Sequence, residues 1–219
     1  MLDAAGWDRR YAEAPGAPSS EPNPLLAELA GPLAAGRALD LAAGTGRNAL
    51  WLAARGWRVT AVDFSHVGLE RAAMRATEIG RELECVHADL YDYRPPEAAF
   101  DLVLISYMHP QEAKRTTVFT AAAEAVAPDG HLLVVGFDVS DPCEGRGPAD
   151  PERRFSVSRL AGAFPGIDIE RCERVTGERQ TAQGPRPTVE TFAWGRRPGG
   201  GLAHGPAARE AGAAGPRTG

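Results

Sequence analysis

Two glycines and a carboxylate between positions 39 and 65 have types and spacing that suit ligand binding. Gly44 and Gly46 follow one short apolar run, and Asp63 follows a second one, 19 residues after Gly44. Glycines let a backbone turn tightly and come close to a ligand. A carboxylate at a strand end accepts hydrogen bonds, for example from the two hydroxyls of a ribose. The pattern Gly-x-Gly-x-x-Ala therefore predicts a loop that holds a dinucleotide or another nucleoside.

Neighbouring residues narrow the choice of ligand. No lysine follows the glycines, which excludes a phosphate-binding NTPase loop. Asp40 lies inside the first apolar run, where its carboxylate suits positive charge better than a pyrophosphate. Asp89 follows a third apolar run and offers an acceptor to an adenine amino group. A nicotinamide cofactor stays an alternative, because the glycines and Asp63 fit it too.

Simpler structural roles compete with these assignments. Asp63 is also a good cap for a helix that starts near Ser65, and Asp89 is also a typical turn residue. Phe64 and Leu90, which follow Asp63 and Asp89 directly, are suited to packing in the hydrophobic core. Asp40 is harder to explain structurally, because a carboxylate buried without a partner is costly.

Alternating strands and helices must position these residues. Apolar segments predict strands at residues 38–43, 57–64, 83–88, 100–107 and 130–137. Between them, periodic segments predict helices at residues 47–56, 66–80 and 110–127. This order predicts right-handed crossovers and a parallel sheet that is covered by helices on both faces. Residues 167–175 and 188–197 predict an antiparallel hairpin joined by a polar loop.

Composition limits the classes of protein. The chain has 219 residues, 43% of them hydrophobic, and a net charge of -5, so we expect one domain with a real core and no affinity for nucleic acid. No apolar run is long enough to span a membrane, and no signal peptide is evident. Three widely spaced cysteines predict a reducing, cytoplasmic setting without a metal site. There is no oligomer signal, which favours a monomer or a weak homodimer.

Five stretches together resemble the class I S-adenosylmethionine-dependent methyltransferases. They are "LDLAAGTGRNA", "VTAVDFS", "HADLYDY", "FDLVLISY" and "VAPDGHLLVVGF", in family order between residues 38 and 137. Upstream, "WDRRY" and "EPNPLL" resemble a small bacterial subgroup related to tellurite-resistance and thiopurine methyltransferases. Ala42 departs from the pattern, since the family usually has a glycine there; we expect a slightly tighter pocket.

The resemblance implies a Rossmann-like, doubly wound α/β fold with three layers. Its mostly parallel seven-stranded sheet would have the order 3-2-1-4-5-7-6, with strand 7 antiparallel. Residues 1–197 would form one methyltransferase domain, in which residues 1–23 cover the cofactor, and the Gly/Ala/Pro-rich residues 198–219 would be a disordered tail. The cofactor S-adenosylmethionine would contact Asp40, Ala42, Gly44, Gly46, Asp63, Phe64, Asp89, Leu90 and Ser106.

The implied reaction is in-line transfer of a methyl group to a small-molecule acceptor, and the acceptor atom stays open between oxygen, nitrogen, sulfur and a metalloid. Tyr107 and His109, just beyond the fourth strand, are the candidate catalytic residues. His109 precedes Pro110, so a helix-cap role is an equal alternative. Substrate or lid contacts are predicted for Trp7, Tyr11, Asp138, Glu144 and Arg146, although an ordinary flexible surface loop is an equal alternative for all of them except Asp138. A non-catalytic module that binds the cofactor is the remaining alternative.

Overall fold

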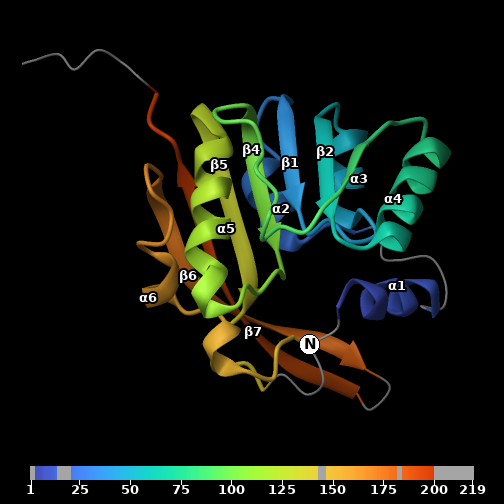
Figure 1. Ribbon diagram of the computed structural model, residues 1–219. Helices are drawn as coiled ribbons and strands as arrows, with labels where there is room; N and C mark the ends of the chain where they lie inside the picture. The colour runs from blue at the N-terminus through green and yellow to red at the C-terminus, as the bar shows by residue number, and fades with distance from the viewer. Residues whose placement is uncertain (1–2, 14–20, 143–146, 182–183, 200–219) are drawn as a thin grey trace, which may run out of the picture.

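A twisted seven-stranded sheet forms the centre of the computed structural model, which describes residues 3–13, 21–142, 147–181 and 184–199 (Figure 1). Within these residues the strand order is β3-β2-β1-β4-β5-β7-β6, and only the pairings of β7 are antiparallel. The predicted fold and strand order are therefore confirmed. The strands are β1 (Arg37–Leu41), β2 (Arg58–Asp63), β3 (Glu84–His87), β4 (Phe100–Ser106), β5 (Val126–Phe137), β6 (Asp168–Thr181) and β7 (Gly184–Arg196).

Helices cover both faces of this sheet, as the apolar central strands require. The helices are α1 (Ala4–Glu13), α2 (Pro24–Ala30), α3 (Arg47–Ala54), α4 (His66–Glu78), α5 (Glu112–Ala125) and α6 (Val157–Leu160), with a short 3-10 turn η1 (Pro151–Arg153). Residues of α2, α3 and α4 share a buried cluster with Ala38 of β1, and residues of α5 and α6 share the opposite cluster with Leu39. Side chains alternate along a strand, so the two clusters are the two faces of the sheet.

Local capping fixes where the helices near the glycine loop begin. Ser65 accepts a hydrogen bond from the Gly68 amide at 3.0 Å and thereby caps α4. Asn23 accepts one from the Leu25 amide at 2.9 Å and caps α2, with Pro24 in the first helical position. Helix α4 thus begins at His66, where the sequence predicts.

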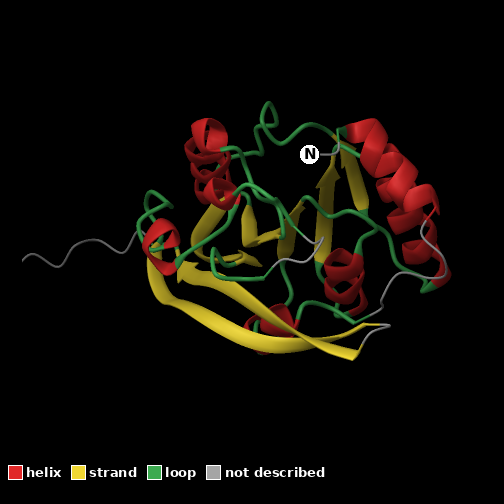
Figure 2. Ribbon diagram, turned by 90° about the horizontal axis from the view of Figure 1, so that it is seen from below, coloured by secondary structure: helices red, strands yellow, loops and turns green. Residues whose placement is uncertain are grey.

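The hairpin of β6 and β7 is longer than expected. Residues 176–187 were predicted as a polar loop, but they continue the antiparallel pairing as far as Thr181 and Gly184. Before Glu190, residues 184–189 of β7 pair with β6 but not with β5, so this part of the hairpin is a two-stranded arm that runs past the rest of the sheet (Figure 2). Pro185 and Pro187 lie where β7 pairs with β6 and not with β5, a sheet-edge position in which proline is tolerated.

The end of helix α5 also differs from the expected one. Helix α5 ends at Ala125 instead of residue 127, because Val126 already pairs with Phe100 of β4 and belongs to β5. Helix α6 is short and ends at Leu160. In the described residues no helix has both the length and the apolar character needed to cross a membrane. The expected tail lies outside the described residues except for Pro198 and Gly199.

Two alanines adopt the left-handed conformation that normally favours glycine. Ala42 has φ 63° at the end of β1, and Ala98 has φ 48° in an exposed loop far along the chain. A side chain in this region costs about 1 kcal/mol. We therefore expect Ala42→Gly and Ala98→Gly each to raise the free energy of unfolding by about 1 kcal/mol, as measured by urea denaturation.

Ala98→Gly is the matched control, because it relieves the same strain outside the glycine loop. A loss of stability in Ala42→Gly alone would mean that the methyl group of Ala42 is needed for packing, and the strain account would be wrong for that position.

Candidate functional site

The β1–α3 loop is built around left-handed backbone positions. Besides Ala42, Gly44 has φ 54° and Gly46 has φ 78°. A Cβ on Gly46 would stand 2.6 Å from the Cβ of Ala72, so a larger residue would push α3 away from α4. The spacing of small residues is thus required by the turn and by the packing of the helix that follows it.

Asp63 ties this loop to the end of β2. Its Oδ2 accepts a hydrogen bond from the Gly44 amide and its Oδ1 accepts one from the Ser65 amide, both at 2.8 Å. Burial raises the pKa of Asp63, and these amides oppose that shift only in part. The cap of α4 is Ser65 and not Asp63, so the simpler alternative for Asp63 is not realised. Each carboxylate oxygen retains a second lone pair for a ligand hydroxyl.

Asp40 is a buried carboxylate without a hydrogen-bond partner. Only 1% of the residue is exposed, and neither oxygen finds a partner among the described residues. Burial, and then the nearby charge of Asp63, raise the pKa of Asp40 to about 7, while the Ala49 backbone amide and the charge of Arg47 lower it. The Ala49 amide does not meet the geometric limits of a hydrogen bond to Asp40, so it is a weak polar contact. An unpaired buried carboxylate is costly, so this position favours a ligand that brings positive charge.

Ser106 is a second buried polar group without a partner. Its Oγ has no hydrogen bond within the described part of the chain. Asp40 pairs with Leu104 across β1 and β4, so Ser106 lies two residues further along on the same face of the sheet. The two unsatisfied groups therefore mark one polar region at the carboxyl ends of adjacent parallel strands, where open α/β sheets bind ligands.

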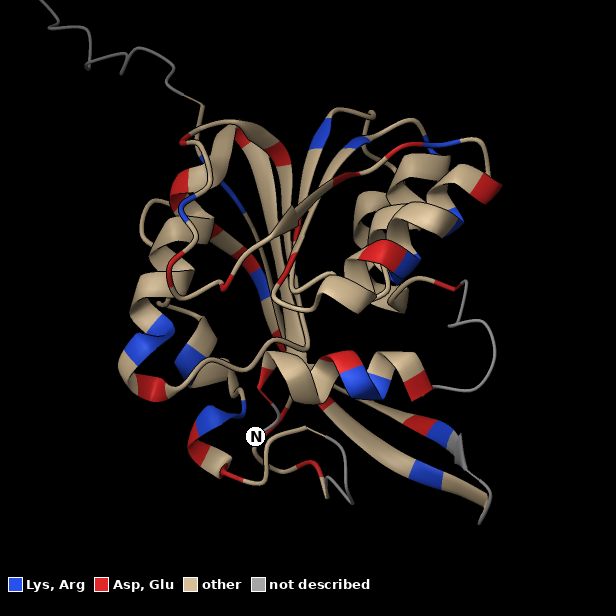
Figure 3. Cartoon of the chain, turned by 45° about the vertical axis from the view of Figure 1, so that its right-hand side comes forward, with Lys and Arg blue, Asp and Glu red and all other residues tan. Residues whose placement is uncertain are grey.

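Helix α1 covers the glycine loop. Figures 1 and 3 place α1 between the carboxyl ends of the strands and the β6–β7 arm. The hydroxyl of Tyr11 lies 2.7 Å from where a Cβ on Gly44 would stand, and the Trp7 and Tyr11 rings are 5.3 Å apart. Both predicted aromatic residues of α1 are thus near the loop.

Asp8 anchors α1 and was not foreseen from the sequence. Its Oδ1 accepts hydrogen bonds from Ser65 Oγ at 2.5 Å and from the Val67 amide at 3.2 Å, at the N-terminus of α4. The Ser65 hydroxyl lowers the pKa of Asp8, more than desolvation raises it. In this helix the sequence analysis singled out the aromatic residues Trp7 and Tyr11, and no local pattern indicated the polar contact of Asp8.

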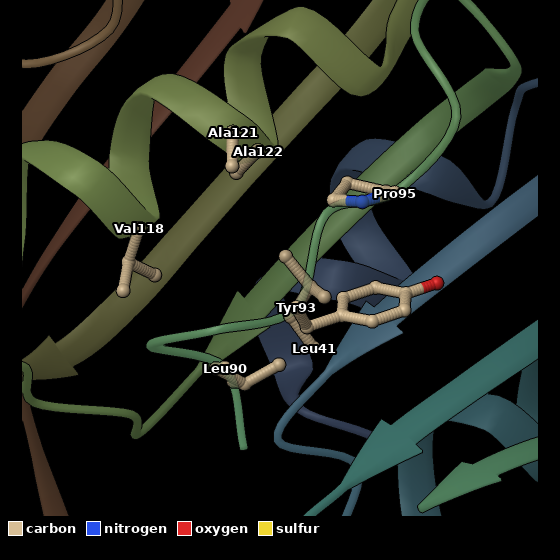
Figure 4. Close-up of a pocket in the computed structure, with 7 residues that line it drawn as sticks. All are labelled: Leu41, Leu90, Tyr93, Pro95, Val118, Ala121 and Ala122. Atoms are coloured by element: carbon tan, nitrogen blue, oxygen red, sulfur yellow. The ribbon is translucent and has the colours of Figure 1, made fainter. Parts of the chain in front are cut away.

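The residues after β2 and β3 border the site less closely. Asp89 is exposed, and its Oδ1 accepts a hydrogen bond from the Tyr91 amide at 2.9 Å, as in an ordinary Asx turn. Phe64 is half-buried. Leu90 is buried and lines a shallow apolar pocket under α5 of about 190 Å³, which includes space open to solvent (Figure 4). The other lining residues are Leu41, Tyr93, Pro95, Val118, Ala121 and Ala122. Cofactor contacts of Asp89, Phe64 and Leu90 stay predictions.

Tyr107 follows Ser106 in a left-handed conformation with φ 57°. Its hydroxyl donates a hydrogen bond to Glu190 Oε1 at 2.6 Å and accepts one from Asn23 Nδ2 at 3.2 Å. Burial, and then the charge of Glu190, raise the pKa of Tyr107 well above its ordinary value. Glu190 lies on β7, far along the chain, and no sequence pattern connects it with the site.

Both ring nitrogens of His109 are engaged by the backbone. Nδ1 lies 3.1 Å from the Arg153 carbonyl oxygen, and Nε2 accepts a hydrogen bond from the Phe137 amide at 3.3 Å. These bonds fix a neutral tautomer with its proton on Nδ1, and burial lowers the pKa of His109 to about 4. In this arrangement neither nitrogen can take a proton from a substrate, so the geometry favours the structural alternative over a general base.

Asp138 is also fully engaged. Its Oδ1 accepts hydrogen bonds from the amide and hydroxyl of Ser140 and lies 3.2 Å from Arg174 Nε, while its Oδ2 accepts one from the Thr191 hydroxyl. Burial raises the pKa of Asp138, but these bonds outweigh it and hold the pKa below its ordinary value. A substrate contact of Asp138 stays a prediction. Glu144 and Arg146 lie outside the described residues.

Comparison with known proteins supports the resemblance. Residues 38–130, less than half of the chain, match the family model of a methyltransferase domain. Demethylmenaquinone methyltransferases of Clavibacter sepedonicus and Thermus thermophilus are 36% identical over 106 residues and 35% identical over 103 residues. These alignments cover 48% and 46% of this chain, and 43% and 47% of the relatives, so the chain matches less than half of their length.

Solved structures, among them structures of methyltransferases, share the fold. TehB of Haemophilus influenzae has a TM-score of 0.68 at 17% identity, covering 80% of this chain and 62% of that one. A Burkholderia thailandensis 1,6-didemethyltoxoflavin-N1-methyltransferase, solved with its substrate and S-adenosylhomocysteine, has a TM-score of 0.58 at 22% identity, covering 80% and 75%. A structure from work on disulfide-to-thioacetal conversion in echinomycin biosynthesis has a TM-score of 0.73 at 22% identity, covering 91% and 94%. The resemblance to class I methyltransferases is confirmed.

The raised pKa of Asp40 makes stability depend on pH. Between about pH 4 and pH 7 the folded chain keeps a proton that the unfolded chain releases, so the ligand-free protein loses stability as pH rises. We expect Asp40→Asn to remove this loss and to raise the free energy of unfolding by about 2–4 kcal/mol near pH 8. Urea denaturation at several pH values measures it.

The exposed Asp92 supplies a matched substitution, and Asp92→Asn should leave the pH profile unchanged. If Asp40→Asn destabilised the protein near pH 8, Asp40 would have a protein partner that the structure lacks, and its assignment to a ligand would fail.

His109 predicts the opposite pH dependence. Because its folded pKa is lowered, the stability it contributes is complete above about pH 6.5 and is lost as pH falls towards 4, by up to ~3 kcal/mol. We expect His109→Gln to cost about 2 kcal/mol at neutral pH and to flatten this acid limb in urea denaturation. An unchanged acid limb would show that His109 is accessible to protons in the folded chain, as a general base would be.

Proposed function

We propose that the chain is an S-adenosylmethionine-dependent methyltransferase that acts on a small-molecule acceptor. The observation that carries this proposal is the buried, unpartnered carboxylate of Asp40 beside a left-handed glycine loop. S-adenosylmethionine brings a positively charged amino group and a sulfonium, whereas a dinucleotide brings a negative pyrophosphate. The unsatisfied Ser106 hydroxyl on the same face also fits a polar, charged end of a ligand.

The remaining groups at this edge of the sheet fit the other parts of the cofactor. In the proposal Asp40 takes the amino group, Ser106 borders the methionine part, and Asp63 accepts the ribose hydroxyls. Carboxylate acceptors with spare lone pairs support the role of Asp63. The glycine loop would lie against the junction of nucleoside and methionine, with Phe64 and Leu90 against adenine and Asp89 at its amino group.

The cofactor supplies an activated methyl group that leaves sulfur by in-line displacement, so the residues of this chain mainly position and shield the reactants. In the proposal, helix α1 shields the loop from water through Tyr11, against which Trp7 packs, and Asp8 holds the helix at the start of α4. Orientation of this kind can contribute roughly 7–11 kcal/mol to the lowering of a barrier.

On the acceptor side we assign positioning roles to two residues that the sequence singled out. His109 joins the end of β4 to η1, and Asp138 joins the end of β5 to β7. Contacts of Glu144 and Arg146 with the acceptor remain part of the proposal. A small-molecule acceptor is supported by the net charge of -5, which does not attract nucleic acid, and by the small compounds named for the relatives. The free thiols of Cys85 and Cys172 suit the reducing cytoplasm.

Two other functions are less well supported. A nicotinamide-dependent oxidoreductase would need its pyrophosphate beside the loop that Asp40 borders, and the antiparallel β7 is not the usual second half of a dinucleotide fold. A non-catalytic module is consistent with Ala42, yet such a module would not require the left-handed Tyr107 at the acceptor side.

Calorimetric titration separates the proposed function from the oxidoreductase. We expect micromolar binding of S-adenosylhomocysteine and no comparable binding of NADPH. Asp63→Ala should weaken S-adenosylhomocysteine binding by about 1.5–3 kcal/mol, because charge-assisted hydrogen bonds are lost, while the exposed Asp92→Ala should not. Micromolar binding of NADPH alone would contradict the proposal.

Turnover then separates an enzyme from a binding module. Formation of S-adenosylhomocysteine would be followed with a panel of thiol, phenol, amine and chalcogenide acceptors. Tight cofactor binding with no transfer to any of them would favour the module.

A further inference from the structure

We propose that Glu190 and Tyr107 form an acid–base pair that removes a proton from a protonated methyl acceptor. The inference rests on the proposed function and adds a residue of β7 to the reaction. It also commits the site to a class of acceptor, one that carries a hydroxyl or similar X–H group and is not ionised beforehand. The contacts around the Tyr107 hydroxyl carry it.

Tyr107 stands where an acceptor must approach. It follows Ser106, whose unsatisfied hydroxyl marks the cofactor end of β4. Its φ of 57° is an outlier for a bulky side chain, and such strain persists only where the surroundings enforce it. The enforcing contacts are a hydrogen bond from its amide to the Val135 carbonyl at 2.8 Å and ring packing on Phe137 at 5.2 Å.

Asn23 fixes the direction of the Tyr107 hydroxyl proton. The Asn23 side-chain oxygen accepts a hydrogen bond from the Leu25 amide at 2.9 Å, so its NH₂ group must be the end that faces Tyr107. An NH₂ group only donates, which makes the Tyr107 oxygen the acceptor of that bond. The Tyr107 proton therefore points to the Glu190 carboxylate, 2.6 Å away.

This arrangement leaves one position on the Tyr107 oxygen for a substrate. A tyrosine hydroxyl has one proton and two lone pairs. The proton goes to Glu190 and one lone pair goes to Asn23, so the second lone pair can accept a hydrogen bond from an acceptor X–H group. Asn23 is held in turn by the hydrogen bond from its own amide to Asn48 Oδ1 at 2.9 Å, which anchors the pair to α3.

The proposed step balances in protons and electrons. The X–H proton moves to the Tyr107 oxygen while the Tyr107 proton moves to Glu190. The electron pair left on X forms the bond to the methyl carbon, and the carbon–sulfur bond breaks with its pair on sulfur. The carboxylate and the sulfonium are thus both neutralised, and Tyr107 ends in its starting protonation state.

Two probe acceptors test the pair. Near pH 8 phenol is protonated, as a tyrosine side chain would be, whereas thiophenol is largely present as the thiolate and needs no base. We expect Glu190→Gln and Tyr107→Phe to lower kcat for phenol by about 100-fold or more and kcat for thiophenol by less than about threefold. Glu178→Gln, on the exposed part of β6, is the matched control and should change neither rate.

Equal losses of kcat with phenol and thiophenol in the two variants, or no loss of kcat with phenol, would overturn the proposed pair. A wild-type protein that methylates thiophenol but not phenol would overturn it as well. Absence of transfer by the wild type to either probe is instead the failure of the proposed function. In that case the pair is decided by calorimetry of phenol binding to the S-adenosylhomocysteine complex. An approximately tenfold weaker affinity for phenol in both variants than in the wild type supports the Glu190–Tyr107 pair. Phenol binding that is undetectable in the wild type, or that is unchanged in the variants, overturns the pair.

Discussion

One buried carboxylate without a partner, that of Asp40, sets the conditions for the rest of this structure. It lies in β1 between β2 and β4, under α3, where burial and Asp63 raise its pKa to about 7. Such a group destabilises the folded chain unless a ligand compensates for it. The packed sheet and helices therefore have to hold it in place, and in the proposed function the positively charged end of the cofactor supplies the compensation.

Other buried polar groups contrast with Asp40. His109 and Asp138 are as well buried, yet the polar atoms of both side chains are hydrogen-bonded within the protein. Satisfied groups of this kind join segments and fix their conformation. Among the described residues, the buried side-chain atoms without a partner belong to Asp40, Ser106 and Arg115. Arg115 lies in α5, whereas Asp40 and Ser106 share one face of the sheet at the carboxyl ends of its strands. Whether a buried polar side chain has hydrogen-bond partners within the protein, more than its residue type, thus separates structural residues from candidate ligand contacts.

The sequence predicted the fold well, because the fold depends on local patterns. Strand and helix periodicity gave the alternation, and the spacing of Gly44, Gly46 and Asp63 identified the turn. Contacts between distant segments have no such signal. Asp8 meets the start of α4, and Glu190 meets Tyr107 across 83 positions of the chain. The β6–β7 arm was missed because its polar, proline-containing strands resemble a loop. The sequence left catalytic and structural roles open for His109, because its distant backbone partners leave no local pattern.

Binding of a positively charged ligand group next to the Asp40 carboxylate is tested most directly by carbon-13 NMR titration of this carboxyl group. The account predicts that the carboxyl group of the ligand-free protein titrates near pH 7, and that saturating S-adenosylhomocysteine shifts this titration to markedly lower pH, because the amino group of the ligand stabilises the carboxylate. A midpoint near that of an ordinary aspartate without ligand, or one that does not move when the ligand binds, would contradict it.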